Sequence, residues 1–507
     1  MKILKFGKCQ KIIFRASFVL CWSILIFTTS RAESLDLTIE VLSTSPARVR
    51  VSGKILEDPN SPKIFDPKRL VFLDAYADAS NLSGRFSNLA FLDSNGKALD
   101  FKKKAVGEFE TGKPASQWSY EANLAVPAAV MASAHVSWLN EQKGLLMLSD
   151  LLPQFPQNKK LDARVRFVLP SGWRIATNEN KVSNGEFTVS DAERAVFLVG
   201  RDFRERVGWI GKTEFRLAIE GTWLFSEEEV IGMASQILEE HRRNLGDIAT
   251  PRVQLFLMRF PRETSMERWR AETRGSTIVL LSGVYPFKSI AVNRLHEQLR
   301  HEIFHLWIPN ALNLTGEYDW FYEGFTLYQA LKTGVRLEYI RFEDFLDSMS
   351  RAFDGAQFAE KIKPVSLLEA SKQRWRGGSD LVYAKGMVVA FLCDAAMLRQ
   401  SGGKRSIGDV LRDLYRKHRF PTAPEEGNAA ILSLLKKSPE AGEIIQKFVE
   451  NSNTVAWSNE IAAIGLQIGL QNVSKSKATR LAVVEKPNGK QRDLLEKLGY
   501  RHELSGD

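Results

Sequence analysis

His301, Glu302, His305 and Glu323 have the residue types and the spacing of a catalytic metal site. On an α-helix, residues four positions apart lie on one face, so the imidazoles of His301 and His305 can bind one cation. Glu302 is rotated by about 100° from His301 and can act as general base beside the open coordination position. Catalytic zinc takes three protein ligands and a water, and Glu323 is the candidate third ligand. The sequence therefore predicts one Zn²⁺ per chain.

These residues fall on two predicted helices. Residues 289–309 carry an apolar stripe at helical spacing, formed by Leu295, Leu299, Ile303 and Leu306. A second helical pattern covers residues 319–332, with Asp319 as N-cap and Gly334 as stop signal, and it places Glu323 in its first turn. Taken alone, residues 301–305 (HExxH) could be a charged helix face exposed to solvent, and Glu323 could interact with the dipole of its helix. Their combination favours zinc ligation.

Three segments resemble one family, the glycyl aminopeptidases of the bacterial gluzincin zinc metallopeptidases. Residues 301–307, HEIFHLW, resemble its HE-x-F-H-x-W, and residues 320–328, WFYEGFTLY, resemble its W-x-x-E-G-F-x-x-Y. Residues 382–406 contain segments similar to its Y-x-K-G and G-G-R-R-S-L motifs. Seventeen residues separate His305 from Glu323, one fewer than is usual in related aminopeptidases. A loop between the two helices can absorb that difference.

The resemblance implies a role for Tyr383, whose hydroxyl would donate a hydrogen bond to the oxyanion formed when water adds to the peptide carbonyl. A phenol with a pKa of about 10 stays protonated at neutral pH and can serve as this donor. Alternatively, Tyr383 could be a helix-surface aromatic that covers the core. With Glu302 as base and zinc on His301, His305 and Glu323, these residues form the predicted site of peptide hydrolysis.

The choice between exopeptidase and endopeptidase depends on Glu272. An aminopeptidase must pair the ammonium group of its substrate with a carboxylate. Related enzymes place this Glu on a G-x-E-H-like segment, which residues 270–277, RAETRGST, match only in part. Glu272 is therefore the candidate anchor, or else a surface charge beside Arg270 and Arg274. We also expect the predicted strand at residues 276–282 to pair with the substrate backbone.

The sequence is compatible with three functions. The favoured one is a zinc aminopeptidase that removes small N-terminal residues. The alternatives are a zinc endopeptidase with the same catalytic centre and a non-catalytic binding protein that retains the fold. The oligomeric state is not predicted.

The first 32 residues have the pattern of a secretory signal peptide. A basic start precedes the uncharged residues 16–27, and small residues follow at the usual cleavage spacing. This stretch is too short to span a hydrocarbon core of about 30 Å. We therefore expect a periplasmic or secreted protein without a stable membrane span in its mature form. Cys9 and Cys21 would leave with the signal, and Cys393 would remain as an inert core residue.

Charge and patterning indicate a multidomain α+β protein. The formal net charge is +10, but six positive charges and no acidic residue lie in residues 1–32, so about +4 remains on the rest. The lysine runs lack interleaved aromatic residues, which argues against nucleic-acid binding. Alternating residues 33–205 predict an antiparallel, β-sandwich-like domain. Residues 206–288 and 289–453 predict the mixed α/β part and the helical zinc lobe of a catalytic domain, which the resemblance implies to be thermolysin-like. Residues 454–507 are too few for the PDZ domain that such enzymes commonly carry. We expect a short tail or a remnant of that domain, with strands at residues 461–470 and 479–484 and a helix at residues 491–498.

Overall fold

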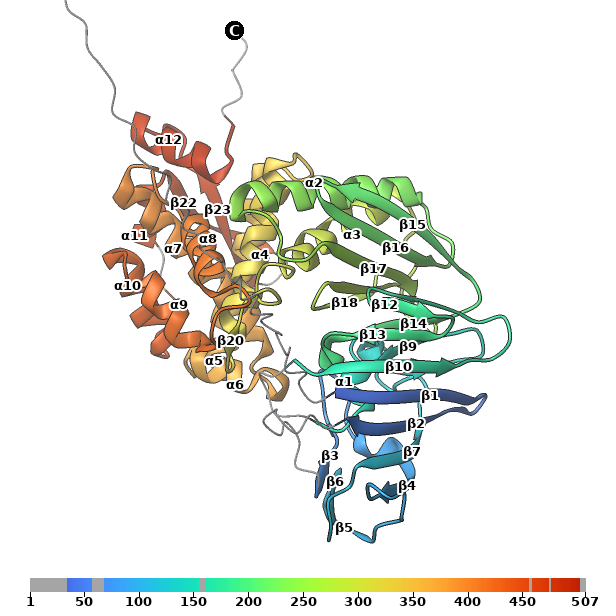
Figure 1. Ribbon diagram of the computed structural model, residues 1–507. Helices are drawn as coiled ribbons and strands as arrows, with labels where there is room; N and C mark the ends of the chain where they lie inside the picture. The colour runs from blue at the N-terminus through green and yellow to red at the C-terminus, as the bar shows by residue number, and fades with distance from the viewer. Residues whose placement is uncertain (1–33, 57–67, 155–159, 456–457, 474–475, 502–507) are drawn as a thin grey trace, which may run out of the picture.

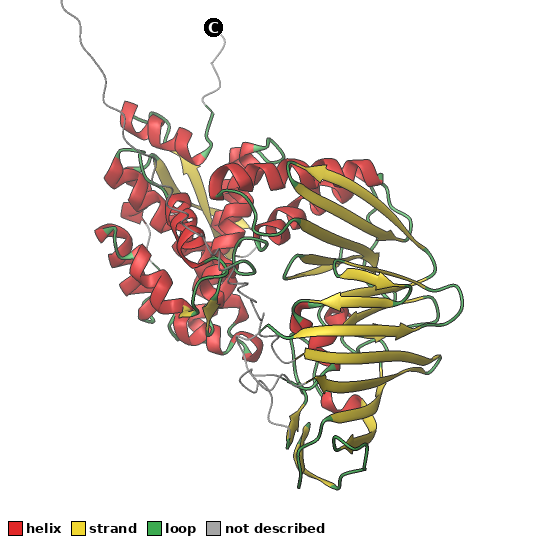
Figure 2. Ribbon diagram, viewed as in Figure 1, coloured by secondary structure: helices red, strands yellow, loops and turns green. Residues whose placement is uncertain are grey.

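The computed structural model describes residues 34–56, 68–154, 160–455, 458–473 and 476–501. The expected signal peptide, residues 1–32, lies outside these residues. Figure 1 shows the first half of the chain as a series of strands and the second half as a cluster of helices beside them. Figure 2 shows the same division into yellow strands and red helices. The predicted α+β multidomain fold is confirmed.

Three sheets form the described part of the N-terminal domain. The largest has the strand order β12-β13-β10-β1-β2-β7-β4, with bounds β1 (Ser34–Thr44), β2 (Ala47–Leu56), β4 (Phe86–Leu92), β7 (Gln117–Asn123), β10 (Asp162–Val168), β12 (Asn180–Ser183) and β13 (Glu186–Val189). A second sheet, in the order β11-β14-β9-β8, contains β8 (Trp138–Leu139), β9 (Lys143–Met147), β11 (Arg174–Thr177) and β14 (Val196–Gly200). A small sheet contains β3 (Arg69–Val71), β5 (Phe101–Ala105) and β6 (Glu108–Thr111).

The alternating sequence pattern predicts the buried faces of these strands but not their directions. Along β10, Ala163, Val165 and Phe167 are buried and their neighbours are exposed. These side chains join one core with residues of the second sheet such as Phe197. However, β1 pairs with β10 in parallel, so this sheet is not purely antiparallel as expected. Alternation of apolar and polar residues depends on which face of the sheet is buried. It is the same whether the neighbouring strand runs parallel or antiparallel.

A five-stranded sheet begins the catalytic domain. Its order is β15-β16-β17-β19-β18, with bounds β15 (Phe203–Ile210), β16 (Thr213–Glu220), β17 (Arg252–Arg259), β18 (Trp269–Arg274) and β19 (Thr277–Ser282). The first strand, β15, starts two residues before the expected domain boundary at residue 205. Helix α2 (Glu227–Leu245) connects β16 to β17 and packs on β15 and β16. Ser226 caps the start of this helix, because its Oγ accepts a 3.2 Å hydrogen bond from Glu229 N.

The expectation that residues 276–282 pair with the substrate backbone is wrong. Strand β19 lies between β17 and β18 and is hydrogen-bonded to both of them. All six of its residues are buried, as in a central strand. The edge strand is β18, whose other side is not paired with a strand of the described residues. A strand's place within its sheet is a tertiary property that the residues of that strand do not reveal.

Ten helical segments follow the sheet in the described residues up to Glu450: α3 (Lys288–Phe304), α4 (Asp319–Arg336), α5 (Phe342–Ile362), α6 (Leu367–Lys372), the π-helix Leu381–Lys385, α7 (Gly386–Ser401), α8 (Ile407–His418), α9 (Gly427–Leu435), α10 (Pro439–Ile445) and the π-helix Gln446–Glu450, besides short 3₁₀ turns. Two predicted helix ends differ from the structure. Helix α3 ends at Phe304 instead of near Pro309. Asp319 is the first residue of α4, and Gly334 lies inside it. A Cβ atom at Gly334 would lie 1.9 Å from Arg300 Nη1, so this glycine allows a close approach and does not end the helix.

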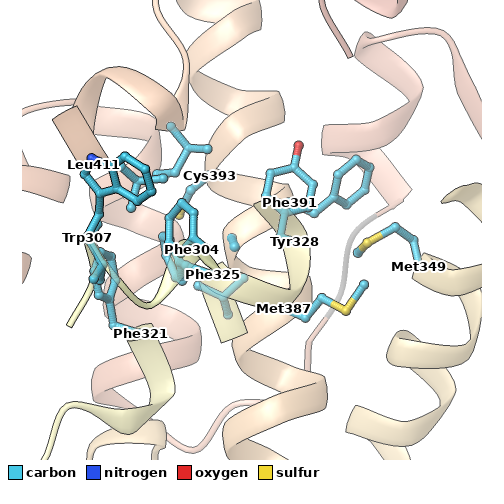
Figure 3. Packing of buried hydrophobic residues seen from close by; sticks show 14 of the residues in the cluster. Phe304, Trp307, Phe321, Phe325, Tyr328, Met349, Met387, Phe391, Cys393 and Leu411 are labelled. Atoms are coloured by element: carbon cyan, nitrogen blue, oxygen red, sulfur yellow. The ribbon is translucent and has the colours of Figure 1, made fainter. Parts of the chain in front are cut away.

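Helix α4 packs closely against α7. A Cβ atom on Gly324 would lie 2.4 Å from the carbonyl carbon of Gly386, so the two backbones can approach only because both residues are glycine. Figure 3 shows the surrounding aromatic and sulfur-containing side chains. Among them is Cys393, which is fully buried as expected and whose thiol pKa is raised by burial. This packing fixes the position of α4, which carries Glu323.

One helical stretch of the described residues, Leu381–Ser401, is long and apolar enough to cross a membrane by length and composition. Within it, 89% of the most apolar window is buried inside the protein, which is typical of a core helix.

The C-terminal tail forms a small packed unit. It contains α11 (Ser458–Ala463), the hairpin strands β22 (Leu466–Val473) and β23 (Ser476–Val483), and α12 (Gly489–Leu498). The hairpin packs on α5, where the backbone nitrogen of Thr479 donates to Asp354 Oδ2 over 3.0 Å. Two strands and a terminal helix were expected, but residues 461–463 are helical.

Candidate active site

Helices α3 and α4 bring the three predicted ligands together. The Nε2 atoms of His301 and His305 lie 3.0 Å apart. Glu323 Oε2 lies 3.3 Å from His301 Nε2 and 3.6 Å from His305 Nε2. One donor atom from each residue lies within 4.8 Å of the others, a spacing at which all three can bind one cation. The N-terminal part of α4, one turn from its start, therefore faces the C-terminal end of α3.

The donor set suits a zinc ion. Two imidazoles and a carboxylate are ligands that zinc accepts in catalytic sites. Glu323 Oε2 is buried and has no hydrogen-bond partner, so a bound cation would satisfy it. His305 Nδ1 lies 3.0 Å from the carbonyl oxygen of Ile308, a contact that leaves Nε2 to face the centre of the site. Burial by itself would raise the pKa of Glu323, but Arg374 and the histidines hold it well below its usual range.

The predicted base, Glu302, is held by the edge strand. Thr273 Oγ1 of β18 lies 2.7 Å from Glu302 Oε2, to which it can donate, and 3.0 Å from the Glu302 carbonyl oxygen. The Glu302 residue is only 4% exposed, so this contact fixes a buried carboxylate beside the proposed ligands. Sequence reasoning missed Thr273. The one sequence feature that pointed to Thr273 was its position directly after Glu272, in the segment that resembles an amine-binding motif.

Tyr383 lies on the π-helix that precedes α7. Its hydroxyl oxygen accepts a 2.6 Å hydrogen bond from Arg374 Nη2. Burial, together with the negative charge of Glu323, raises the pKa of the Tyr383 phenol well above its usual range. The phenol therefore stays protonated and can donate its own hydrogen. Tyr383 is half-buried beside the ligand cluster, not an aromatic on the outer surface.

Arg374 is the second residue that sequence reasoning missed. Its Nη2 lies 2.8 Å from Glu323 Oε1, and its Nη1 lies 2.8 Å from Asp319 Oδ1. Nη1 also donates to the Tyr322 hydroxyl over 2.9 Å. Asp319 and Glu323, one turn apart on α4, were a signal that a cation should lie nearby, but nothing in the sequence identifies which one. The guanidinium links a proposed ligand with the proposed oxyanion donor.

Glu272 contacts residues of the N-terminal domain and Arg274. Its Oε1 accepts hydrogen bonds from the Tyr76 hydroxyl at 2.7 Å and from Arg274 Nε at 2.8 Å. Its Oε2 lies 2.6 Å from His135 Nδ1. Burial would raise the pKa of Glu272, but Arg274 and His135 outweigh that effect and lower it to about 2. Thr273 contacts Glu302, whereas Glu272 contacts the N-terminal domain, because neighbouring side chains on a strand point to opposite faces.

Aromatic rings connect the Glu272 cluster with the predicted zinc site. The ring of Trp375 lies 5.8 Å from that of Tyr76 and 6.5 Å from that of His135, measured between centroids. The Arg374 guanidinium lies over the same Trp375 ring, 4.4 Å from its centroid. The N-terminal domain therefore reaches to within one side chain of the residues around Glu323.

Part of the chain matches a known protein family. Residues 78–196 match the family described as Peptidase M61 N-terminal domain. This match supports a gluzincin-type peptidase. The resemblance drawn from the HExxH region is thereby confirmed at this level. The matched segment includes His135, one of the partners of Glu272. No curated protein matches the sequence.

Solved structures share the fold of this chain. An aminopeptidase N family protein from Idiomarina loihiensis has a TM-score of 0.69 at 16% identity, over 86% of this chain and 79% of that one. An M1 zinc metallopeptidase mutant from Deinococcus radiodurans, bound to a Tyr-Ser-Ala substrate, has a TM-score of 0.55 at 13% identity, over 84% and 95% of the two chains. The same mutant without the peptide gives 0.54. At such identities the likeness concerns the fold alone.

Proposed function

We propose that this peptidase is a zinc-dependent aminopeptidase that acts outside the cytoplasm, in the periplasm or after secretion. One observation supports the hydrolytic role above the others. Two imidazoles and a carboxylate converge within 4.8 Å, and a buried glutamate held by Thr273 lies directly beside them. The location rests on the signal-like residues 1–32. In this proposal His301, His305 and Glu323 hold the metal, and Glu302 and Tyr383 are the catalytic residues.

The chemistry follows from the placement of these groups. When bound, zinc supplies a Lewis acid that polarises the peptide carbonyl and activates water. Glu302 removes a proton from the attacking water and passes it to the leaving amine. Tyr383, kept protonated by burial, donates a hydrogen bond to the oxyanion. Arg374 holds the Tyr383 oxygen, so the hydroxyl hydrogen is left to point at the substrate.

The peptide adds to β18 in this proposal. Asn310 already pairs with the end of this edge, since its Nδ2 donates to the Thr273 carbonyl at 3.0 Å and its Oδ1 accepts from Gly275 N at 3.1 Å. In an antiparallel strand, residues two apart point their backbone groups the same way. Ala271 therefore presents its N–H and C=O on the side to which Thr273 points its carbonyl, and it is the proposed position of substrate pairing.

Exopeptidase specificity rests on Glu272. A carboxylate can accept about four hydrogen bonds. Tyr76 and Arg274 bind Oε1 and His135 binds Oε2, so Oε2 keeps one acceptor position for a substrate ammonium group. The peptide bound by the Deinococcus structure is a tripeptide, which fits short peptides as substrates here. We infer that small residues such as Gly or Ala are released from free amino termini.

One observation favours a zinc endopeptidase as the second candidate. Arg274 already forms an ion pair with Glu272 at 2.8 Å, so the carboxylate charge is balanced before any substrate binds. The deciding experiment compares matched peptides with free and acetylated amino termini, with products identified by mass spectrometry. An aminopeptidase releases the first residue from the free peptide only. Equal cleavage of both peptides at internal bonds would support the endopeptidase instead.

A further inference from the structure

A pocket lies beside α3, and none of the three proposed zinc ligands lines it. It has a volume of about 410 Å³ and is lined by residues of α3, α4, α5 and the connection between α4 and α5. His296 and Arg300, four residues apart on α3, provide its polar inner wall. Leu331, Tyr339 and Ile340 provide apolar surface. The pocket plays no part in the hydrolysis described above.

The inner wall carries a buried cation without a partner. Arg300 is 3% exposed, and its Nε and Nη1 atoms have no hydrogen-bond partner. His296 is 1% exposed, and neither of its ring nitrogens has a hydrogen-bond partner. Arginine does not lose its charge in proteins. A buried, unpaired guanidinium is costly, and an anion in the pocket would relieve that cost.

The two acidic residues that line the pocket form ion pairs with arginines other than Arg300. Glu297 forms an ion pair with Arg294 at 2.8 Å, and Asp344 pairs with Arg341 at 3.2 Å. In the described part of the chain, no carboxylate oxygen lies within 4.0 Å of the Arg300 side chain. Arg351, on the α5 side, also lines the pocket, and its Nη2 lies 3.0 Å from Ser348 Oγ. Among the described residues, Arg300 therefore has no carboxylate within ion-pair distance.

The carboxyl end of α4 offers only a partial explanation. The Arg300 guanidinium lies against Gly334, two residues before the last residue of α4. A helix C-terminus carries about half a negative charge, which favours a cation there. That effect leaves Nε and Nη1 without acceptors, and it does not account for Arg351 or for the space beside them.

We propose that this pocket binds a small molecule bearing an oxyanion, a carboxylate or a phosphate group, which Arg300 holds with support from Arg351. The planar fork of a guanidinium matches both groups. The apolar wall formed by Leu331, Tyr339 and Ile340 suits a ligand with a short hydrocarbon part.

The test is isothermal titration calorimetry of the purified, zinc-loaded protein with sodium phosphate and sodium acetate at constant ionic strength. We expect saturable binding of at least one probe with a Kd of about 1 mM or tighter. Binding of phosphate would indicate a ligand with a phosphate group, and binding of acetate a ligand with a carboxylate group. Arg300→Met should weaken that binding by about tenfold or more. Arg416→Met removes the same charge on the exposed face of α8, outside the pocket, and should leave the Kd unchanged.

Two results would overturn the proposal: no binding of either probe to the wild-type protein, or an unchanged Kd in Arg300→Met. If Arg300→Met does not fold, Arg351→Met provides the decision, because Arg351 lies on an exposed position of α5. Weaker binding in Arg351→Met supports the site, and unchanged binding rejects it. Thermal unfolding with and without phosphate gives an independent readout, since a ligand of the folded state raises Tm.

Discussion

Arg374 Nη2 lies 2.8 Å from Glu323 Oε1, the carboxylate oxygen opposite the one that faces the two histidines. Glu323 therefore presents Oε2 alone to the proposed metal. The same nitrogen donates to the Tyr383 hydroxyl at 2.6 Å. One guanidinium thus sets both the orientation of a proposed ligand and the orientation of the proposed oxyanion donor.

This relationship predicts that Arg374→Met lowers both zinc affinity and kcat. Without the guanidinium, Glu323 loses the contact that orients it, and removal of such an outer contact typically costs about 10- to 100-fold in metal affinity. Zinc affinity is measured by competition with a chromophoric chelator. Arg376→Met removes an exposed cation two residues away and should change neither quantity. Normal zinc affinity in Arg374→Met would show that Arg374 does not position Glu323.

The proposed site predicts about one tightly bound zinc per chain. Protein purified without chelator should contain it by elemental analysis. Treatment with a chelator should abolish hydrolysis, and added zinc should restore it. Protein that neither contains zinc nor binds it on titration would contradict the assignment of all three ligands.

The roles of the two site glutamates can be separated. Glu302→Gln should retain zinc, because Glu302 is not a proposed ligand, and should lose turnover by orders of magnitude. Glu323→Ala should lose zinc affinity as well as turnover. Near-normal turnover in Glu302→Gln would exclude Glu302 as the base. Zinc content and kcat measured on the same preparations distinguish the two effects.

For Tyr383, the change to phenylalanine keeps the ring and removes the hydroxyl. We expect kcat to fall by roughly 100-fold or more with little change in KM, as for loss of an oxyanion donor. Steady-state kinetics on an aminoacyl chromogenic substrate measures both constants. A higher KM with unchanged kcat would instead make Tyr383 a substrate-binding residue.

Glu272 should also connect stability with pH. Its pKa is lowered to about 2 in the folded protein, below an ordinary value of about 4.3 in an unfolded chain. Its charged interactions with Arg274 and His135 therefore stabilise the protein fully above about pH 4.3 and lose that effect as the pH falls toward 2. Glu272→Gln should lower the free energy of unfolding at pH 7, and the difference from wild type should shrink between pH 4 and pH 2. Urea denaturation at several pH values measures this. A constant difference across that range would exclude an ionised Glu272.

The sequence by itself determined the features that depend on regular spacing. Residues four apart share a helix face, so the closeness of His301 and His305 follows from local hydrogen bonding alone. The motif around Glu323 predicted a second helix with that carboxylate in its first turn, and alternation predicted the buried face of strands such as β10. The family resemblance had the same origin, since its motifs are short and continuous.

Tertiary structure decided whatever depends on residues that are far apart in the chain. Arg374 reaches Glu323 across 51 positions, and Tyr76 reaches Glu272 across 196. The edge position of β18, the parallel pairing of β1 with β10 and the place of Gly334 inside α4 are likewise set by packing against other elements. Such contacts form when buried surfaces fit together, and no local periodicity records them. The sequence therefore predicted the ligands and the base, whereas only the folded chain shows which side chains orient them.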